Sequence, residues 1–150
     1  MMTHYIIDGN NLIGKIPALM KIQKKDKQSS REKLALMLQR YFLNKKANVT
    51  LHLDGFAVTK INAGRIKIIY SENITADEKI KNQIEKSKSP RTITVITSDS
   101  NLTQFAKVCS CKVIPSEDFA KQLNNKSQDD EQTIIDSMKN DDEFKKLFGV

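Results

Sequence analysis

The sequence contains no tryptophan, two cysteines, three prolines and five glycines in 150 residues. Two cysteines are too few for the disulfide framework of a small secreted domain. Cys109 and Cys111 are separated by one residue, so on a strand they would point to opposite faces of the sheet. We therefore interpret both as packing thiols in a reducing cytoplasm. The chain also has no internal repeat and no low-complexity stretch, and its length is that of one main domain.

Long apolar runs and cofactor-binding loops are absent as well. No apolar run approaches the roughly 20 residues that a membrane span needs, so we expect no membrane partner. The sequence has no Gly-x-Gly-x-x-Gly or Gly-x-x-x-x-Gly-Lys-Ser/Thr motif, which excludes the common loops that cradle nucleotide phosphates. It has no Cys-x-x-Cys or His-Glu-x-x-His zinc pattern and no Gly-x-Ser-x-Gly nucleophile elbow.

Acidic residues are scarce in most of the chain and concentrated at its end. Residues 1–126 hold 22 Lys/Arg and 11 Asp/Glu, whereas residues 127–150 hold 3 and 7. A basic body attracts polyanions, above all RNA or DNA, although a lysine-rich solvated surface has the same composition. We divide the chain into a domain over residues 1–124 and an acidic extension over 125–150. In that extension Ile134, Ile135 and Met138 predict an amphipathic helix.

Strand and helix patterns alternate along the domain. Short apolar runs predict strands at residues 5–7, 49–53, 65–70, 93–96 and 112–114. Helices are expected at residues 16–22, 29–45, 75–86, 101–108 and 116–123. Capping boxes predict two of the helix starts, Ser29 with Glu32 and Thr75 with Glu78, and Ser116 is expected to cap the last. This alternation predicts an α/β fold with parallel strands and right-handed crossovers.

Four aspartates follow or lie beside the predicted strand ends. Asp8, Asp54 and Asp99 follow the first, second and fourth strands, and Asp77 lies in the first turn of the helix after the third. Ligands of open α/β sheets bind at the carboxyl ends of the strands. Carboxylates gathered there repel one another unless a cation lies between them, and hard divalent cations prefer carboxylate oxygen. The pattern therefore predicts a Mg²⁺ or Mn²⁺ site that can activate a water molecule without a protein nucleophile.

Each of these acidic residues also has a purely structural interpretation. Asp8-Gly9 and Asp54-Gly55 are common turn dipeptides. Asp77 would suit the dipole of its helix, and Asp99 could cap the next helix, although Ser98 could do so instead.

Two further polar residues, Glu78 and Asn11, have open roles. Glu78 is either a metal ligand or the partner in the capping box. Asn11 either orients a carboxylate or substrate, or caps the short helix that follows. His4 and His52 have no ligand partner at metal-binding spacing, so we interpret both as structural.

Several segments together resemble the YacP-like branch of the NYN domain family, within the PIN-like and flap-nuclease superfamily. The resemblance spans roughly residues 4–123 and depends most on the Asp-Gly-x-Asn opening and the Thr-Ala-Asp-Glu block. One departure is Asn10, where the YacP-like pattern often has an aromatic residue, which should alter substrate contact more than metal binding. The matching segments are residues 6–14, 31–34, 53–55, 71–80 and 94–99.

The resemblance implies a PIN-like three-layer α/β/α sandwich with a mostly parallel sheet of about five strands in the order 3-2-1-4-5. It also implies a Mg²⁺- or Mn²⁺-dependent endoribonuclease of the bacterial cytoplasm that acts on translated or structured RNA, with the ribosome as a further candidate partner. By position, Asp8, Asp77 and Asp99 would be catalytic acids that bind the metal, with Asp54 as a fourth ligand. Asn11 would join the catalytic residues, and Ser98 and Glu78 would support them.

Four basic residues lie near these motifs in the sequence and are candidates to hold the RNA backbone: Lys15, Lys60, Arg65 and Lys79. The leading hypothesis is a metal-dependent endoribonuclease. A non-catalytic RNA- or ribosome-binding module on the same fold is the alternative, and a phosphohydrolase acting on small phosphoesters is the third. Salt-sensitive RNA binding without cleavage would identify the binding module.

Overall fold

The computed structural model of the chain describes residues 2–125, so the predicted extension lies outside the described residues except for Asn125. The last described helix covers residues 116–125. The other elements, in chain order, are β1 (Thr3–Asp8), α1 (Gly9–Ile13), α2 (Pro17–Lys25), α3 (Lys27–Phe42), β2 (Ala47–Leu53), β3 (Lys67–Tyr70), α4 (Ala76–Lys86), a short 3-10 helix (Pro90–Thr92), β4 (Ile93–Ile96), α5 (Ser100–Val108) and β5 (Lys112–Ile114).

The five strands form one parallel sheet in the order β3-β2-β1-β4-β5, which confirms the predicted fold class and strand order. β1 lies at the centre, between β2 and β4. Asp8 at the end of β1 is opposite His52 near the end of β2, and Ile7 is opposite Ile96 at the end of β4. The residues that follow these three strands therefore leave the sheet at the same edge, which we call the carboxyl edge.

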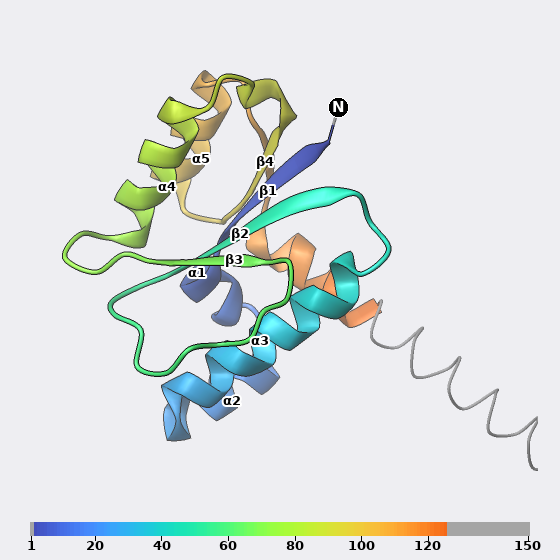
Figure 1. The fold of residues 1–150 in the computed structure, drawn as a ribbon, viewed down its shortest axis with the longest axis vertical. Helices are drawn as coiled ribbons and strands as arrows, with labels where there is room; N and C mark the ends of the chain where they lie inside the picture. The colour runs from blue at the N-terminus through green and yellow to red at the C-terminus, as the bar shows by residue number, and fades with distance from the viewer. Residues whose placement is uncertain (1, 126–150) are drawn as a thin grey trace, which may run out of the picture.

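Helices cover both faces of the sheet, with α4 and α5 on one side and α2 and α3 on the other (Figure 1). Side chains alternate between these faces along each strand, as the pleat requires. Ile7 and Leu51 belong to the larger buried cluster with α3 and Phe119, and Ile6 and Val95 belong to the smaller cluster with α4 and α5. The molecule is thus a three-layer α/β/α sandwich with two cores.

The start of α3 differs from the prediction. The helix begins at Lys27, and its cap is the Asp26 carboxylate, which accepts a hydrogen bond from Gln28 N at 3.0 Å. Ser29 lies inside the helix and donates its hydroxyl to Asp26. The predicted capping box of Ser29 and Glu32 is therefore wrong, because an acid three residues earlier already fills the role. The Thr75 cap is confirmed: its hydroxyl accepts from Glu78 N at 3.1 Å.

The face of the sheet beneath α4 carries an unusual buried polar group. His4 Nε2 lies 2.9 Å from Thr50 Oγ1, and His52 Nε2 lies 2.7 Å from Gln83 Oε1. Gln83 also donates to Thr50 at 3.2 Å, so α4 is joined to β1 and β2 through side chains. Burial lowers the pKa of both histidines, which favours their neutral forms.

Within residues 2–125, no helix combines the length and apolar character needed to cross a membrane. Cys109 and Cys111 are both free thiols in this part of the chain. Burial raises the pKa of the Cys111 thiol to about 11, so this thiol is an inert packing group of the smaller core.

Candidate metal and RNA site

Asp8 ends the central strand, and Gly9 starts α1 directly behind it. A Cβ added at Gly9 would lie 2.6 Å from the His52 carbonyl oxygen and 2.7 Å from Leu53 Cδ2. Only glycine allows α1 to pass this close to the backbone of β2. The Asp8-Gly9 pair is therefore a strand-to-helix junction and not a turn, and it fixes the position of the Asp8 side chain at the carboxyl edge.

Asp54 ends the neighbouring strand, and both of its carboxylate oxygens accept hydrogen bonds. Oδ1 accepts from Ala76 N at 3.0 Å, and Oδ2 accepts from the Asn10 amide. The next residue, Gly55, has a φ of +83° and donates its N–H to the Ser71 hydroxyl. Asp54 therefore links the end of β2 to the start of α4 and to α1.

Three carboxylates interact electrostatically at this edge. Burial is the main cause that raises the pKa of Asp8 to about 6, and the negative charges of Asp54 and Asp77 raise it further. A hydrogen bond of 3.0 Å from Thr97 Oγ1 to Asp8 Oδ2 opposes part of this rise. Asp77 lies in the first turn of α4 and forms an ion pair with Lys81 at 3.3 Å. The charges of Asp54 and Asp77 are therefore close enough to act on Asp8, whereas the gathering of the predicted aspartates around one ion stays a prediction.

Asp99 has a different position. Its carboxylate caps α5 by accepting a hydrogen bond from Leu102 N at 2.8 Å, which is the structural role that the sequence left open. Its backbone N–H donates to Thr97 Oγ1 at 3.1 Å, and the same hydroxyl donates to Asp8. Thr97 therefore joins Asp99 to Asp8, although the Asp99 side chain is exposed.

Asn11 organises the other side of Asp8. Its Oδ1 accepts two hydrogen bonds, from Ser98 N at 2.9 Å and from Ser116 Oγ at 2.7 Å. Since the oxygen is held in this way, the NH₂ of the side chain points away from both donors. Ser98 in turn donates its hydroxyl to Glu117 and accepts from Ser116 N at 2.8 Å. The ends of β1 and β4 are thereby fixed to the helix at residues 116–125.

The carboxylates provide hard oxygen donors of the kind that Mg²⁺ and Mn²⁺ select. Within residues 2–125, however, no three His, Cys, Asp or Glu side chains are close enough together to hold one ion. Mg²⁺ is usually held by one or two carboxylates together with water and substrate phosphate, so a pair of acids is sufficient for it. Asp54 is the less suitable ligand among these acids, because both of its carboxylate oxygens already accept hydrogen bonds.

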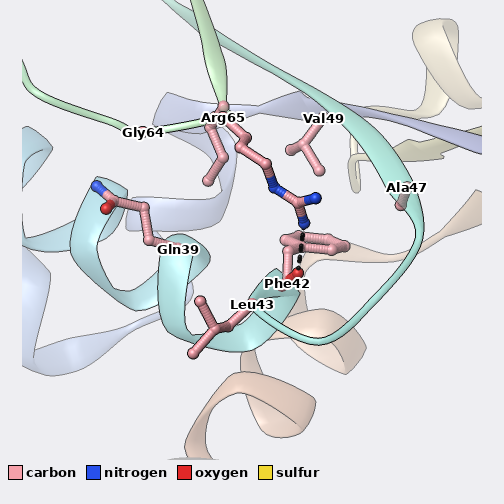
Figure 2. Close-up of a pocket in the computed structure, with 8 residues that line it drawn as sticks. Gln39, Phe42, Leu43, Ala47, Val49, Gly64 and Arg65 are labelled. Atoms are coloured by element: carbon pink, nitrogen blue, oxygen red, sulfur yellow. Dashed lines mark hydrogen bonds between the residues drawn. The ribbon is translucent and has the colours of Figure 1, made fainter.

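The four predicted RNA-binding residues do not lie together. Lys15 follows α1, Lys60 lies in the exposed segment between β2 and β3, and Lys79 is close enough to His52 to lower its pKa. Arg65 lies at the opposite end of the sheet, where its guanidinium donates to the Phe42 carbonyl oxygen at 3.2 Å (Figure 2). It also donates to the Lys45 carbonyl oxygen at 3.2 Å. Closeness to a motif in the sequence therefore does not place Arg65 near the acids.

Three residues that the sequence did not single out belong to this site: Thr97, Ser116 and Glu117. A fourth, Arg31, is almost completely buried on α3. Its guanidinium donates to the Asp54 carbonyl oxygen and lies 5.8 Å from the Tyr70 ring centre. A buried arginine is uncommon without such partners. Arg31 lies in the segment at residues 31–34, one of those that resemble the family, and it thus supports the end of β2.

Comparisons with known proteins agree with this fold. The model of the YacP-like NYN domain family matches residues 5–147, which extends past the span of roughly 4–123 given by the motifs. Two solved structures of Rae1 (YacP) from Bacillus subtilis have a similar fold. One is a point mutant with a TM-score of 0.76 and 21% identity, covering 92% of this chain and 85% of that chain. The other structure has a TM-score of 0.72 and 19% identity, and the match covers 99% of this chain and 88% of that chain. No curated protein matches the chain by sequence.

Proposed function

The chain belongs to the YacP-like NYN domain family, a family generally of nucleases, and from this premise we propose that it is a divalent-metal-dependent endoribonuclease of the cytoplasm. The observation that carries the proposal is the raised pKa of Asp8 at the carboxyl edge, beside the charges of Asp54 and Asp77. A carboxyl group whose pKa is raised by burial and by neighbouring negative charges is typical of a functional site.

In this proposal Asp8 and Asp77 would hold the ion, with Asp99 on the far side of Thr97 as a third candidate. A bound Mg²⁺ or Mn²⁺ would neutralise phosphate charge and lower the pKa of a water molecule that attacks phosphorus. The chain's own residues fix the geometry: Thr97 holds one oxygen of Asp8, and Asp54 holds the start of α4, which carries Asp77.

Asn11 has a defined role in the same proposal. Because its oxygen accepts from Ser98 and Ser116, its NH₂ group is oriented as a donor. We assign this donor to a phosphate oxygen of the RNA. Lys15, Lys60 and Lys79 would bind neighbouring phosphates, and Arg65 is not part of this path because it lies at the other end of the sheet. Translated mRNA, presented by the ribosome, is the substrate that the family resemblance favours.

The alternative is a non-catalytic RNA- or ribosome-binding module. It is favoured by the capping role of Asp99 and by the absence of a three-residue ligand cluster among residues 2–125. Both functions predict RNA binding that weakens as salt rises. Only the nuclease predicts that RNA is cut in the presence of a divalent ion.

Cleavage of labelled RNA, naked and on translating ribosomes, separates the two functions. The wild type is expected to cut RNA with Mg²⁺ or Mn²⁺ and to stop when the metal is chelated. Asp8→Asn and Asp77→Asn should each reduce the rate at least 100-fold while RNA binding persists. Glu85→Gln is the matched control, because this exposed acid lies on the same helix as Asp77. Equal cleavage by the wild type and Asp8→Asn would contradict the proposal, and binding without any cleavage would favour the module.

A further inference from the structure

A groove lies away from the acidic site, between α2, α3 and the helix at residues 116–125. It encloses about 450 Å³, and its floor is apolar, formed by side chains that include Ile16, Leu19, Ile22, Met37 and Ala120. The larger core is already complete beneath it, because Leu19 is buried while Ile16, Ile22, Met37 and Ala120 are only partly covered. The groove therefore offers apolar surface that residues 2–125 leave partly open.

The rim of the groove is strongly basic. Lys15, Lys33, Arg40 and Lys121 line it and are exposed, and Glu117 is the one acid among the lining residues. Glu117 already accepts the Ser98 hydroxyl. Within residues 2–125, none of the four cations forms an ion pair. The groove thus fits an occupant that combines apolar side chains with negative charge.

The position where the described chain ends indicates the occupant. Glu117, Ala120, Lys121 and Asn124 all line the groove, so the last described helix is one of its walls. Residues 127–150 follow directly and contain 7 Asp/Glu against 3 Lys/Arg. Ile134, Ile135 and Met138 lie between the acids at 129–131 and those at 141–143. This composition is complementary to an apolar floor with a basic rim.

The distance along the chain is sufficient. The nine residues from Asn125 to Ile134 can span about 30 Å when extended. The ten-residue helix that forms the wall is about 15 Å long. The chain can therefore turn back along the groove and place its apolar residues on the floor. A tethered segment also has an effective concentration in the millimolar range, so it outcompetes a second copy of the chain in dilute solution.

We propose that residues 127–150 dock into this groove of the same molecule, with Ile134, Ile135 and Met138 on the apolar floor and the flanking acids beside Lys33, Arg40 and Lys121. The inference does not depend on the proposed nuclease activity, because it uses none of the aspartates at the carboxyl edge; Lys15 and Glu117 line the groove and also lie beside the proposed RNA path.

A zero-length carbodiimide cross-linker, which joins amines to carboxylates, tests the docking on the intact wild-type chain. Mass spectrometry of the monomer band is expected to show links from the acids at 129–131 or 141–143 to Lys33, Lys121 or Lys15. Links found only in a dimer band would assign the groove to a second copy and overturn the proposal. Equal linkage to Lys86 and Lys88, which are exposed at and after the end of α4, would also overturn it.

A fluorescent reporter gives a second, independent test, because the chain contains no tryptophan. The emission of full-length Met138→Trp is expected at shorter wavelength than that of a peptide of residues 127–150 with the same substitution. Adding Lys33→Glu and Arg40→Glu to this protein should shift its emission to the wavelength of the peptide. Adding Lys86→Glu and Lys88→Glu makes the same charge change away from the groove and should leave the emission wavelength unchanged. Emission equal to that of the peptide in all three proteins would contradict the docking. A shift that disappears on dilution would assign the groove to a second copy of the chain and overturn the proposal.

Discussion

Asp8-Gly9 at the end of β1 and Asp54-Gly55 at the end of β2 have the same two-residue sequence, but their surroundings differ. Gly9 is packed against the backbone of β2, whereas a Cβ on Gly55 would have no atom within 4 Å. One oxygen of Asp8 accepts a hydrogen bond from Thr97, whereas both oxygens of Asp54 are bonded. The second pair thus stabilises the frame around the carboxyl edge, and in the proposed function the first pair presents its acid to a ligand.

The two glycines give the largest expected difference. Gly9→Ala should lower the free energy of unfolding by about 3 kcal/mol, because the new methyl group collides with a strand backbone that cannot move freely. Gly55→Ala should cost about 1 kcal/mol, since it meets only the strain of a positive φ. Urea denaturation of both variants measures the two losses in the free energy of unfolding directly. Equal losses would show that the two junctions are not packed differently.

The Asp8 carboxyl group should make stability depend on pH. Its pKa rises from 3.8 to about 6 on folding, so between these values the folded state binds more protons than the unfolded state. The contribution of this group to the free energy of unfolding is therefore fully present below about pH 4. It is lost as the pH rises through 6, and the loss is at most about 3 kcal/mol. In metal-free buffer, Asp8→Asn should be more stable than the wild type at pH 7.5 and lose this advantage at pH 4. A constant gap across this range would contradict the assignment.

Asp54→Asn is expected to have the opposite effect at neutral pH. It replaces one of two bonded oxygens by a donor, which then faces the Asn10 amide or the Ala76 N–H. The expected loss is about 2 kcal/mol of unfolding free energy. Thermal denaturation of Asp8→Asn and Asp54→Asn in parallel at pH 7.5 should therefore give shifts of opposite sign. Shifts of the same sign would remove the distinction between the two acids.

Ser116→Ala is expected to lower the free energy of unfolding by only about 1 kcal/mol, because Asn11 keeps its bond from Ser98 N. Its effect on the site should be more specific. If Asn11 presents its NH₂ to the RNA, the rate of single-turnover cleavage should fall about tenfold without a change in the pH profile. Ser116→Thr retains the hydroxyl group and is the matched control. Identical rates for both variants would show that the Asn11 amide needs no support from this helix.

The strands and the acids at their ends could be predicted because each feature depends on a few adjacent residues. Ile93–Ile96 is a β-branched run that ends before Asp99, and Thr75 caps α4 three residues before Glu78. The start of α3 was misassigned because two plausible caps, Asp26 and Ser29, lie within one turn. The helix α1 has five residues, too few to show a helical period.

The connections around the acids could not be predicted from local patterns. Asn11, Ser98 and Ser116 meet only because β1, β4 and the helix at residues 116–125 end at the same place, up to 105 residues apart in sequence. Ser116, expected as a helix cap, donates to Asn11 instead. Arg65 was placed near the RNA from its distance to a motif, but it precedes β3 and therefore lies at the amino ends of the strands.

The most direct test of the central claim is a calorimetric titration with Mn²⁺, done with and without a single-stranded RNA. The account predicts that the wild type and Asp54→Asn bind Mn²⁺ with similar affinity, whereas Asp8→Asn and Asp77→Asn bind it at least tenfold more weakly. RNA should strengthen binding to the wild type, because substrate phosphate completes the ligand set. Equal Mn²⁺ affinity of the wild type and Asp8→Asn, or no binding to the wild type in either condition, would contradict the account.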